Sequence, residues 1–146
     1  MNYQILLVED EPITGDMLRR ALIGETIGGE GIDVTIADDG RNAIANMAPG
    51  KFDLVVLDLK LPYMTGDEVL AELRNIDPYI DVIVYTNYQD PPVMKKLMNL
   101  GVAGYINKGA EADIWATVEQ IKARLSPVPD TERKSLLNKC SNSEPE

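Results

Sequence analysis

The sequence of 146 residues contains no histidine and one cysteine, Cys140. Without histidine, the chain cannot form a Ser–His–Asp triad, bind a metal through imidazole or carry a phosphohistidine. A single cysteine cannot form a disulfide within the chain, which favours a reducing compartment, and we expect the protein to be cytoplasmic. Any catalysis or metal binding by this chain must therefore use other side chains.

Long apolar runs and an excess of basic residues are also missing. No apolar run approaches the roughly 20 residues that a membrane helix needs, and the first residues lack the pattern of a signal peptide. Lys and Arg number 14 against 24 Asp and Glu, which gives a net charge of −10. Nucleic acids and anionic membranes attract basic surfaces, so we expect neither as a partner.

Five apolar β-prone runs alternate with five helical patterns, and the length suits one domain with a sizeable core. The predicted strands cover residues 3–8, 34–37, 52–57, 82–86 and 104–106. The inward-facing positions of the predicted helices are Met17, Leu18, Ala21 and Leu22; Ala43, Ile44 and Met47; Val69, Leu70 and Leu73; Val93, Met94, Leu97 and Met98; Ile114, Val118, Ile121 and Leu125. This alternation predicts an α/β fold in which helices cover both faces of a parallel sheet.

Two segments do not fit the alternation. Residues 24–31 are rich in glycine and predict a break after the first helix. Residues 126–146 contain Pro127 and Pro129, several charges and few large apolar residues, which is typical of a linker or tail. We therefore predict one domain over residues 1–125 and a flexible tail over residues 126–146.

Two of the predicted strands end at carboxylates, because Glu9 and Asp10 follow the first strand and Asp58 follows the third. In an open parallel sheet, ligands bind at the carboxyl ends of the strands. Carboxylates that converge there repel one another unless a cation lies among them, and oxygen ligands suit Mg²⁺, Mn²⁺ or Ca²⁺. A carboxylate beside such an ion can act as a nucleophile toward a phosphoryl group.

The order of several motifs resembles the receiver domain of two-component response regulators. These motifs are the acids just named, the run Leu57-Asp58-Leu59-Lys60-Leu61-Pro62, and then Gly66, Thr86 and Lys108. The resemblance covers about residues 3–125. It implies a doubly wound (βα)5 fold of the flavodoxin-like type, with five parallel strands in the order 2-1-3-4-5. That order would place the first and third strands side by side and bring the acids together.

The resemblance also implies roles for the acidic residues. Asp58 matches the phosphoacceptor, and Glu9, Asp10, Asp58 and the backbone carbonyl of Lys60 would bind Mg²⁺, with Mn²⁺ as an alternative. The family most often has two aspartates after the first strand, and Glu9 is a longer variant of one of them. Glu11 is assigned to an ordinary solvated turn.

Three further residues match positions that respond to the phosphoryl group. Thr86 and Lys108 would contact its oxygens, and Tyr105 would turn when Thr86 moves, which changes the surface formed by helix four, strand five and helix five. Two departures are expected to matter. Gly109 replaces the proline that usually follows the lysine, and Asn87 replaces a smaller residue after the threonine.

A sensor histidine kinase or a histidine phosphotransfer protein is the implied phosphoryl donor, and the downstream protein target is not legible in the sequence. We expect the chain to catalyse only its own phosphorylation and dephosphorylation, and so not to be an enzyme for an external substrate. Residues 126–146 are too few for a DNA-binding or catalytic output domain, so we expect a stand-alone regulator, with a receiver cut from a longer protein as the alternative. It would be a monomer or would dimerise on phosphorylation.

Three alternatives stay open. A phosphohydrolase with an aspartate nucleophile is disfavoured because such enzymes generally have a second aspartate at the position of Lys60. A flavodoxin-like electron carrier is disfavoured because the acids after the first strand would repel a flavin phosphate. The third alternative is a receiver fold that docks onto partners without being phosphorylated.

Overall fold

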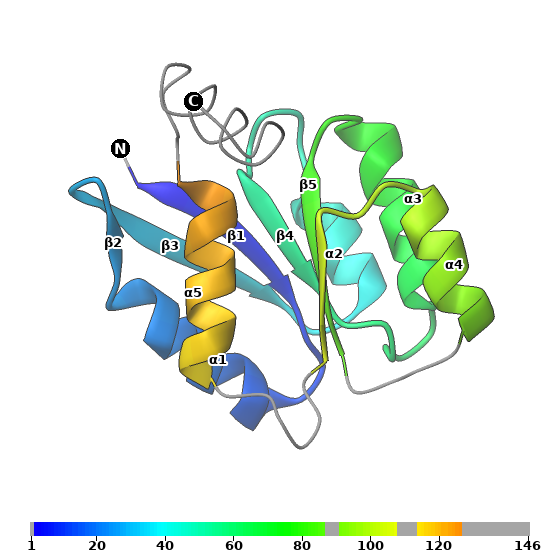
Figure 1. The fold of residues 1–146 in the computed structure, drawn as a ribbon. Coiled ribbons are helices and arrows are strands. Elements are labelled where there is room, and N and C mark those ends of the chain that lie inside the picture. The colour runs from blue at the N-terminus through cyan, green and yellow to red at the C-terminus, as the bar shows by residue number, and fades with distance from the viewer. Residues whose placement is uncertain (1, 87–90, 108–113, 127–146) are drawn as a thin grey trace, which may run out of the picture.

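Alternating strands and helices make up the computed structural model, which describes residues 2–86, 91–107 and 114–126 (Figure 1). The strands are β1 (Tyr3–Val8), β2 (Thr26–Ile27), β3 (Glu30–Ala37), β4 (Leu54–Leu57), β5 (Asp81–Thr86) and β6 (Gly104–Asn107). The helices are α1 (Pro12–Ile23), α2 (Gly40–Asn46), α3 (Gly66–Ile76), α4 (Pro91–Asn99) and α5 (Ile114–Leu125). None of these helices has the length and apolar character needed to cross a membrane.

The strands form one sheet in the order β2-β3-β1-β4-β5-β6. Five strands, β3, β1, β4, β5 and β6, pair in parallel in that order. Because β3 is the second predicted strand and β4, β5 and β6 are the third to fifth, this is the expected order 2-1-3-4-5. The predicted α/β class and doubly wound topology are therefore confirmed.

The glycine-rich segment after α1 differs from the prediction. It forms a hairpin rather than a plain break, because β2 pairs antiparallel with the start of β3 and adds a sixth strand at the edge. Gly28 and Gly29 form its turn with φ values of 58° and 88°, a backbone region that glycine enters without a steric cost. The second predicted strand accordingly begins at Glu30 instead of residue 34.

Helices cover both faces of the sheet, and successive residues of β1 show how the core is divided. Ile5 and Leu7 pack in the cluster that includes side chains of α1 and α5, whereas Leu6 and Val8 pack in the cluster that includes side chains of α2, α3 and α4. Figure 1 shows the same division, with α1 and α5 on one side of the strands and the other three helices on the opposite side. Burial on both faces explains why the last four residues of β1 and all of β4 are apolar.

Two methionines point the other way from the prediction. Met17 in α1 and Met98 in α4 are 55% and 72% exposed, although both were expected to face the core. The buried face of each helix is narrower than predicted. Its large buried side chains are Leu18 and Leu22 in α1, four residues apart, and Leu97 alone in α4. A residue adjacent to the buried position in sequence lies about 100° round the helix, which places each methionine at the border of the apolar face.

Candidate acidic site at the carboxyl edge of the sheet

Glu9, Asp10 and Asp58 meet at the carboxyl ends of β1 and β4. One carboxylate oxygen of each residue lies within 4.8 Å of the corresponding oxygens of the other two. The backbone pairing continues past the strands, because the Glu9 N–H donates to the Ala37 carbonyl at 2.9 Å and the Asp58 N–H donates to the Val8 carbonyl at 3.0 Å. The sheet therefore places the two acids that follow β1 directly beside the acid that follows β4.

The acids differ in burial. Glu9 and Asp58 are only 2% and 4% exposed, whereas Asp10 is exposed. The Glu9 side chain lies against α1, where a Cβ atom on Gly15 would be 3.5 Å from the Glu9 Cγ atom, and its carboxylate accepts the Glu11 N–H at 3.1 Å. The contact between Gly15 and Glu9 was not predicted from the sequence. The signal for it was the small size of Gly15 on the helix that follows the acids.

The loop after β4 is closed on itself by short backbone contacts. The Lys60 N–H donates to Oδ1 of Asp58 at 3.2 Å, and Lys60 pairs with Thr65 in an isolated antiparallel bridge. The Gly66 N–H donates to the Leu59 carbonyl at 3.1 Å. These contacts hold the Lys60 peptide beside Asp58, where its carbonyl was expected to act.

A capping box closes the same loop at its far end. The Glu68 carboxylate accepts the N–H of Thr65 at 2.9 Å and the hydroxyl of Thr65 at 3.1 Å. This arrangement satisfies a backbone donor at the start of α3. The loop is therefore held between the end of β4 and the capped start of a helix.

Thr86 and Tyr105 lie on the same face of neighbouring strands. Thr86 ends β5 and is fully buried. Tyr105 pairs with Val84, two residues before Thr86, and residues two apart on a strand share a face. Tyr105 is half-buried against the core cluster that includes Leu97 of α4, and this burial raises the pKa of its phenol.

Three of the residues singled out in the sequence lie outside the described residues: Lys108, Gly109 and Asn87. The strand that precedes Lys108 is described, and its last residue, Asn107, pairs with Thr86. The predicted tail over residues 126–146 is described only at Ser126.

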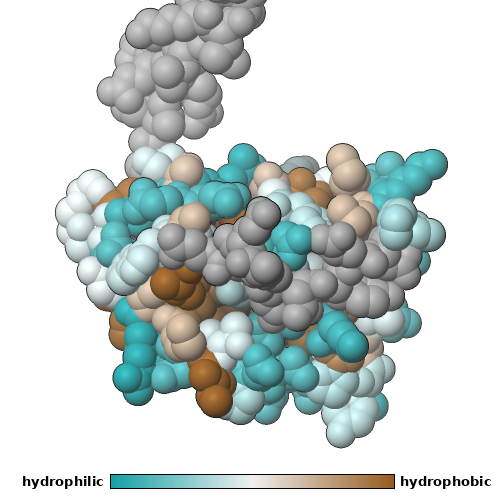
Figure 2. Space-filling view, turned by 60° about the horizontal axis from the view of Figure 1, so that its bottom comes forward, coloured by the Kyte–Doolittle hydropathy of each residue, from teal (hydrophilic) through white to brown (hydrophobic). Residues whose placement is uncertain are grey.

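The donor set at this edge fits a hard divalent cation. All the candidate ligands are oxygens, and three of them are carboxylates whose mutual repulsion a divalent ion would offset. Figure 2 turns this edge toward the viewer and shows that hydrophilic residues dominate the coloured surface, with small and separate apolar patches. Of the three acids, Asp10 is the one that is exposed.

The structure is a doubly wound α/β domain with three neighbouring acids, two of them buried, at the carboxyl edge of its sheet. Comparison with known proteins identifies its family. The family model of the response regulator receiver domain matches residues 5–119. The chain therefore belongs to the response regulator receiver domains of two-component systems.

One curated relative matches over most of its own length. The sporulation initiation phosphotransferase F of Bacillus subtilis is 32% identical over 113 residues, which cover 77% of this chain and 87% of that protein. Several other matched relatives are transcriptional regulatory proteins, and one is a protein-glutamate methylesterase of Paramagnetospirillum magneticum. This chain spans between 27% and 54% of their lengths.

Solved structures show the same fold. A CheY-like receiver domain protein from Methanospirillum hungatei is 27% identical, with a TM-score of 0.76 and coverage of 92% of this chain and 98% of that one. The response regulator TrrA of Thermotoga maritima, solved in complex with Mg²⁺ and BeF, is 28% identical with a TM-score of 0.67. The two chains are covered to 84% and 98%, respectively.

Proposed function

We propose that this receiver domain accepts a phosphoryl group on Asp58 in a reaction that depends on a divalent cation. Receiver domains take the group from a histidine kinase or a histidine phosphotransfer protein, and one of these is the proposed donor. The observation that carries the proposal is the convergence of Glu9, Asp10 and Asp58 within 4.8 Å at the carboxyl edge. The complex of TrrA with Mg²⁺ and BeF, in a related receiver, supports the same chemistry here.

In this proposal Asp58 is the nucleophile. One of its carboxylate oxygens forms a bond to phosphorus while the bond from phosphorus to the donor's histidine nitrogen breaks. Glu9, Asp10, Asp58 and the Lys60 carbonyl would hold Mg²⁺ or Mn²⁺, which supplies charge neutralisation for the carboxylates and the phosphoryl oxygens. The Lys60 N–H, which already donates to Asp58, orients the carboxylate for the attack.

Thr86, Lys108 and Tyr105 would respond to the modification. The Thr86 hydroxyl donates a hydrogen bond to a phosphoryl oxygen, and the Lys108 ammonium pairs with the same group. Tyr105 shares the face of Thr86 and contacts the cluster on the α4 side, so a movement of Thr86 gives the ring space to turn. The product of the reaction is a changed protein-binding surface over α4, β6 and α5.

We further propose that the chain modifies only itself and acts in the cytoplasm. Lys60 occupies the position where a phosphohydrolase would need a second acid, which supports self-modification over turnover of an external substrate. Residues 1–125 would be the working domain and residues 126–146 a tail.

Phosphorylation by acetyl phosphate tests the proposal. With Mg²⁺, the wild-type chain should take up one phosphoryl group by intact mass spectrometry, and hydroxylamine should remove it because the product is an acyl phosphate. Asp58→Asn should abolish the uptake. Asp53→Asn is the matched control, because Asp53 lies at the opposite end of β4 and accepts the Gln4 N–H at 2.8 Å. Uptake by Asp58→Asn, or none by the wild-type chain, would contradict the proposal.

A further inference from the structure

The α4 helix is held by fewer buried side chains than its neighbour α3. In α4 only Leu97 is buried, whereas α3 buries Val69, Leu70 and Leu73 together with Gly66. Complete burial of a large apolar side chain contributes roughly 1.5–3 kcal/mol. Polar contacts therefore have a larger share in positioning α4 than in positioning α3.

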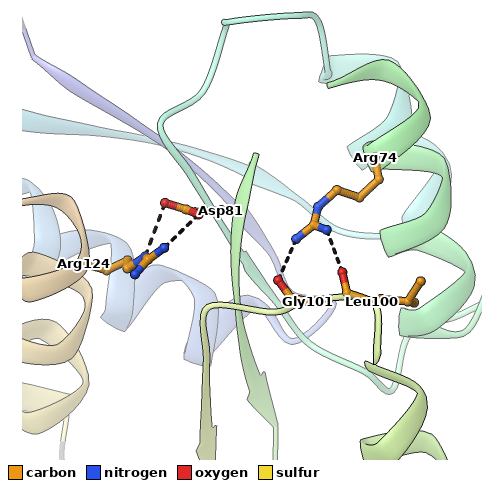
Figure 3. Close-up of polar contacts among 5 residues, drawn as sticks. All are labelled: Arg74, Asp81, Leu100, Gly101 and Arg124. Carbon is orange, nitrogen blue, oxygen red and sulfur yellow. Dashed lines mark hydrogen bonds and ion pairs between the residues drawn. The ribbon is translucent and has the colours of Figure 1, made fainter. Parts of the chain in front are cut away.

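The C-terminal end of α4 is anchored by Arg74 of α3. The guanidinium of Arg74 donates to the Leu100 carbonyl at 2.7 Å and to the Gly101 carbonyl at 3.1 Å, as Figure 3 shows. Both carbonyls follow the last turn of α4, where a cation also interacts favourably with the helix dipole. This end of the helix is thus fixed on α3 by two hydrogen bonds to a charged group.

Within α4 itself, one ion pair reaches α3. Nζ of Lys96 lies 2.9 Å from Oδ2 of Asp67, whose side chain is 12% exposed. A hydrogen bond from Thr65, followed by the one from Lys96, holds the pKa of Asp67 below its ordinary value, so the carboxylate is ionised near neutral pH. The pair joins the first turn of α3 to the last turn of α4.

A cavity of about 230 Å³ lies between these elements and the phosphoacceptor loop. It is lined by residues 59–61 of that loop, by residues 65–67 at the start of α3, and by Val93 in the first turn of α4. This pocket is partly open to solvent. The loop and the first turn of α4 therefore face each other across this pocket.

Asp67 is connected to the phosphoacceptor by a short series of contacts. It follows Gly66, whose N–H donates to the carbonyl of Leu59, the residue next to Asp58. The bridge between Lys60 and Thr65 closes the same loop. Asp67 is thus linked to the residues after Asp58 by one backbone hydrogen bond and one isolated bridge.

We propose that the Asp67–Lys96 ion pair couples α4 to the phosphoacceptor loop and restrains α4, and that phosphorylation releases this restraint. The inference rests on the proposed function and adds the residues through which α4 responds. The pair is formed in the described conformation, so a movement of α4 away from the loop must break it. Removal of the pair should therefore make the modified conformation easier to reach.

Lys96→Met tests the coupling, and Arg124→Met is the matched control. Arg124 also pairs a helix cation with an aspartate of a neighbouring element, because its Nη2 atom lies 3.0 Å from Oδ1 of Asp81 (Figure 3). That pair joins α5 to β5 and has no contact with the loop after Asp58. Lys96 is 65% exposed, so its replacement should leave the fold intact.

The first measurement is hydrogen exchange of the α4 amides without a phosphoryl analogue. We expect Lys96→Met to speed exchange over residues 93–99 and Arg124→Met to leave that segment unchanged. Equal exchange in Lys96→Met and the wild-type chain would overturn the inference. This readout does not depend on the proposed chemistry.

The second measurement is the affinity for beryllofluoride with Mg²⁺, by calorimetry. Lys96→Met should bind about two- to five-fold tighter than wild type, the range expected for loss of an exposed ion pair. Asp67→Asn should show the same change, and the double variant no more than either single one. Unchanged or weaker binding by Lys96→Met, or an equal gain in Arg124→Met, would overturn the inference alone. No binding by the wild-type chain would overturn the proposed function, and this inference with it.

Discussion

Among single residues, Gly66 determines the shape of the loop beside Asp58. A Cβ atom at this position would lie 2.7 Å from the Leu59 Cα atom, a distance that only a backbone shift could relieve. We expect Gly66→Ala to lower the free energy of unfolding by about 1–3 kcal/mol. Urea denaturation measures this change.

Gly24→Ala is the control for that substitution. Its nearest neighbour would be the Arg20 carbonyl oxygen at 3.7 Å, an ordinary contact, and its φ of −83° suits any residue. We expect a change within about 0.5 kcal/mol. Similar losses in the two variants would mean that the close approach at Gly66 has no special cost.

The acidic residues should destabilise the fold when no divalent ion is present. Three carboxylate oxygens within 4.8 Å repel one another, so Asp58→Asn should raise the free energy of unfolding in a chelator by about 1–2 kcal/mol. Thermal unfolding measures the difference. Asp53→Asn should give no such rise in the free energy of unfolding, because it weakens the acceptor of the Gln4 N–H. If Asp58→Asn were less stable than the wild-type chain, the expectation would be contradicted.

At the scale of helices and strands, the contact between α3 and α4 should depend on pH. Hydrogen bonds from Thr65 and Lys96 hold the pKa of Asp67 below its ordinary value of 3.8. A lowered pKa in the folded state means that these partners add stability above the ordinary value, and that the contribution is lost as the pH falls through the folded-state pKa.

Asp67→Asn should therefore destabilise the domain by up to about 1 kcal/mol near pH 7, and the difference from wild type should shrink as the pH falls from about 5 toward 3. Urea denaturation at a series of pH values measures it. A difference that grows on acidification would contradict this assignment.

Apolar periodicity predicted every long element of the described fold, because β1 and β4 are buried on both faces and the larger helices have one apolar face. It could not predict β2, which has two residues and only Ile27 buried, since a glycine-rich turn forms a hairpin only through its pairing with β3. Nor could it orient Met17 and Met98, because a flexible apolar side chain at the border of a helix face is tolerated on either side.

In the whole molecule, the meeting of Asp10 with Asp58 could be predicted once the strand order was known, and that order came from the resemblance to receiver domains. The contact of Glu9 with Gly15 and the Asp67–Lys96 pair could not be predicted in this way. Both depend on how far a side chain reaches from one element to the next, a property that periodicity does not contain. The convergence of the acids at this edge is therefore readable from sequence, whereas its connection to α4 requires coordinates.

Mg²⁺ should stabilise the whole domain beyond its effect on ionic strength. The net charge of −10 means that any salt relieves some repulsion, so NaCl at matched ionic strength is the reference. A ligand that binds only the folded state adds about 2.7 kcal/mol at a hundredfold excess over its Kd. We expect a rise in the thermal midpoint with MgCl₂ over NaCl that Glu9→Gln reduces and Asp58→Asn largely removes. Equal midpoints in the two salts for the wild-type chain would show that the acidic residues hold no specific ion.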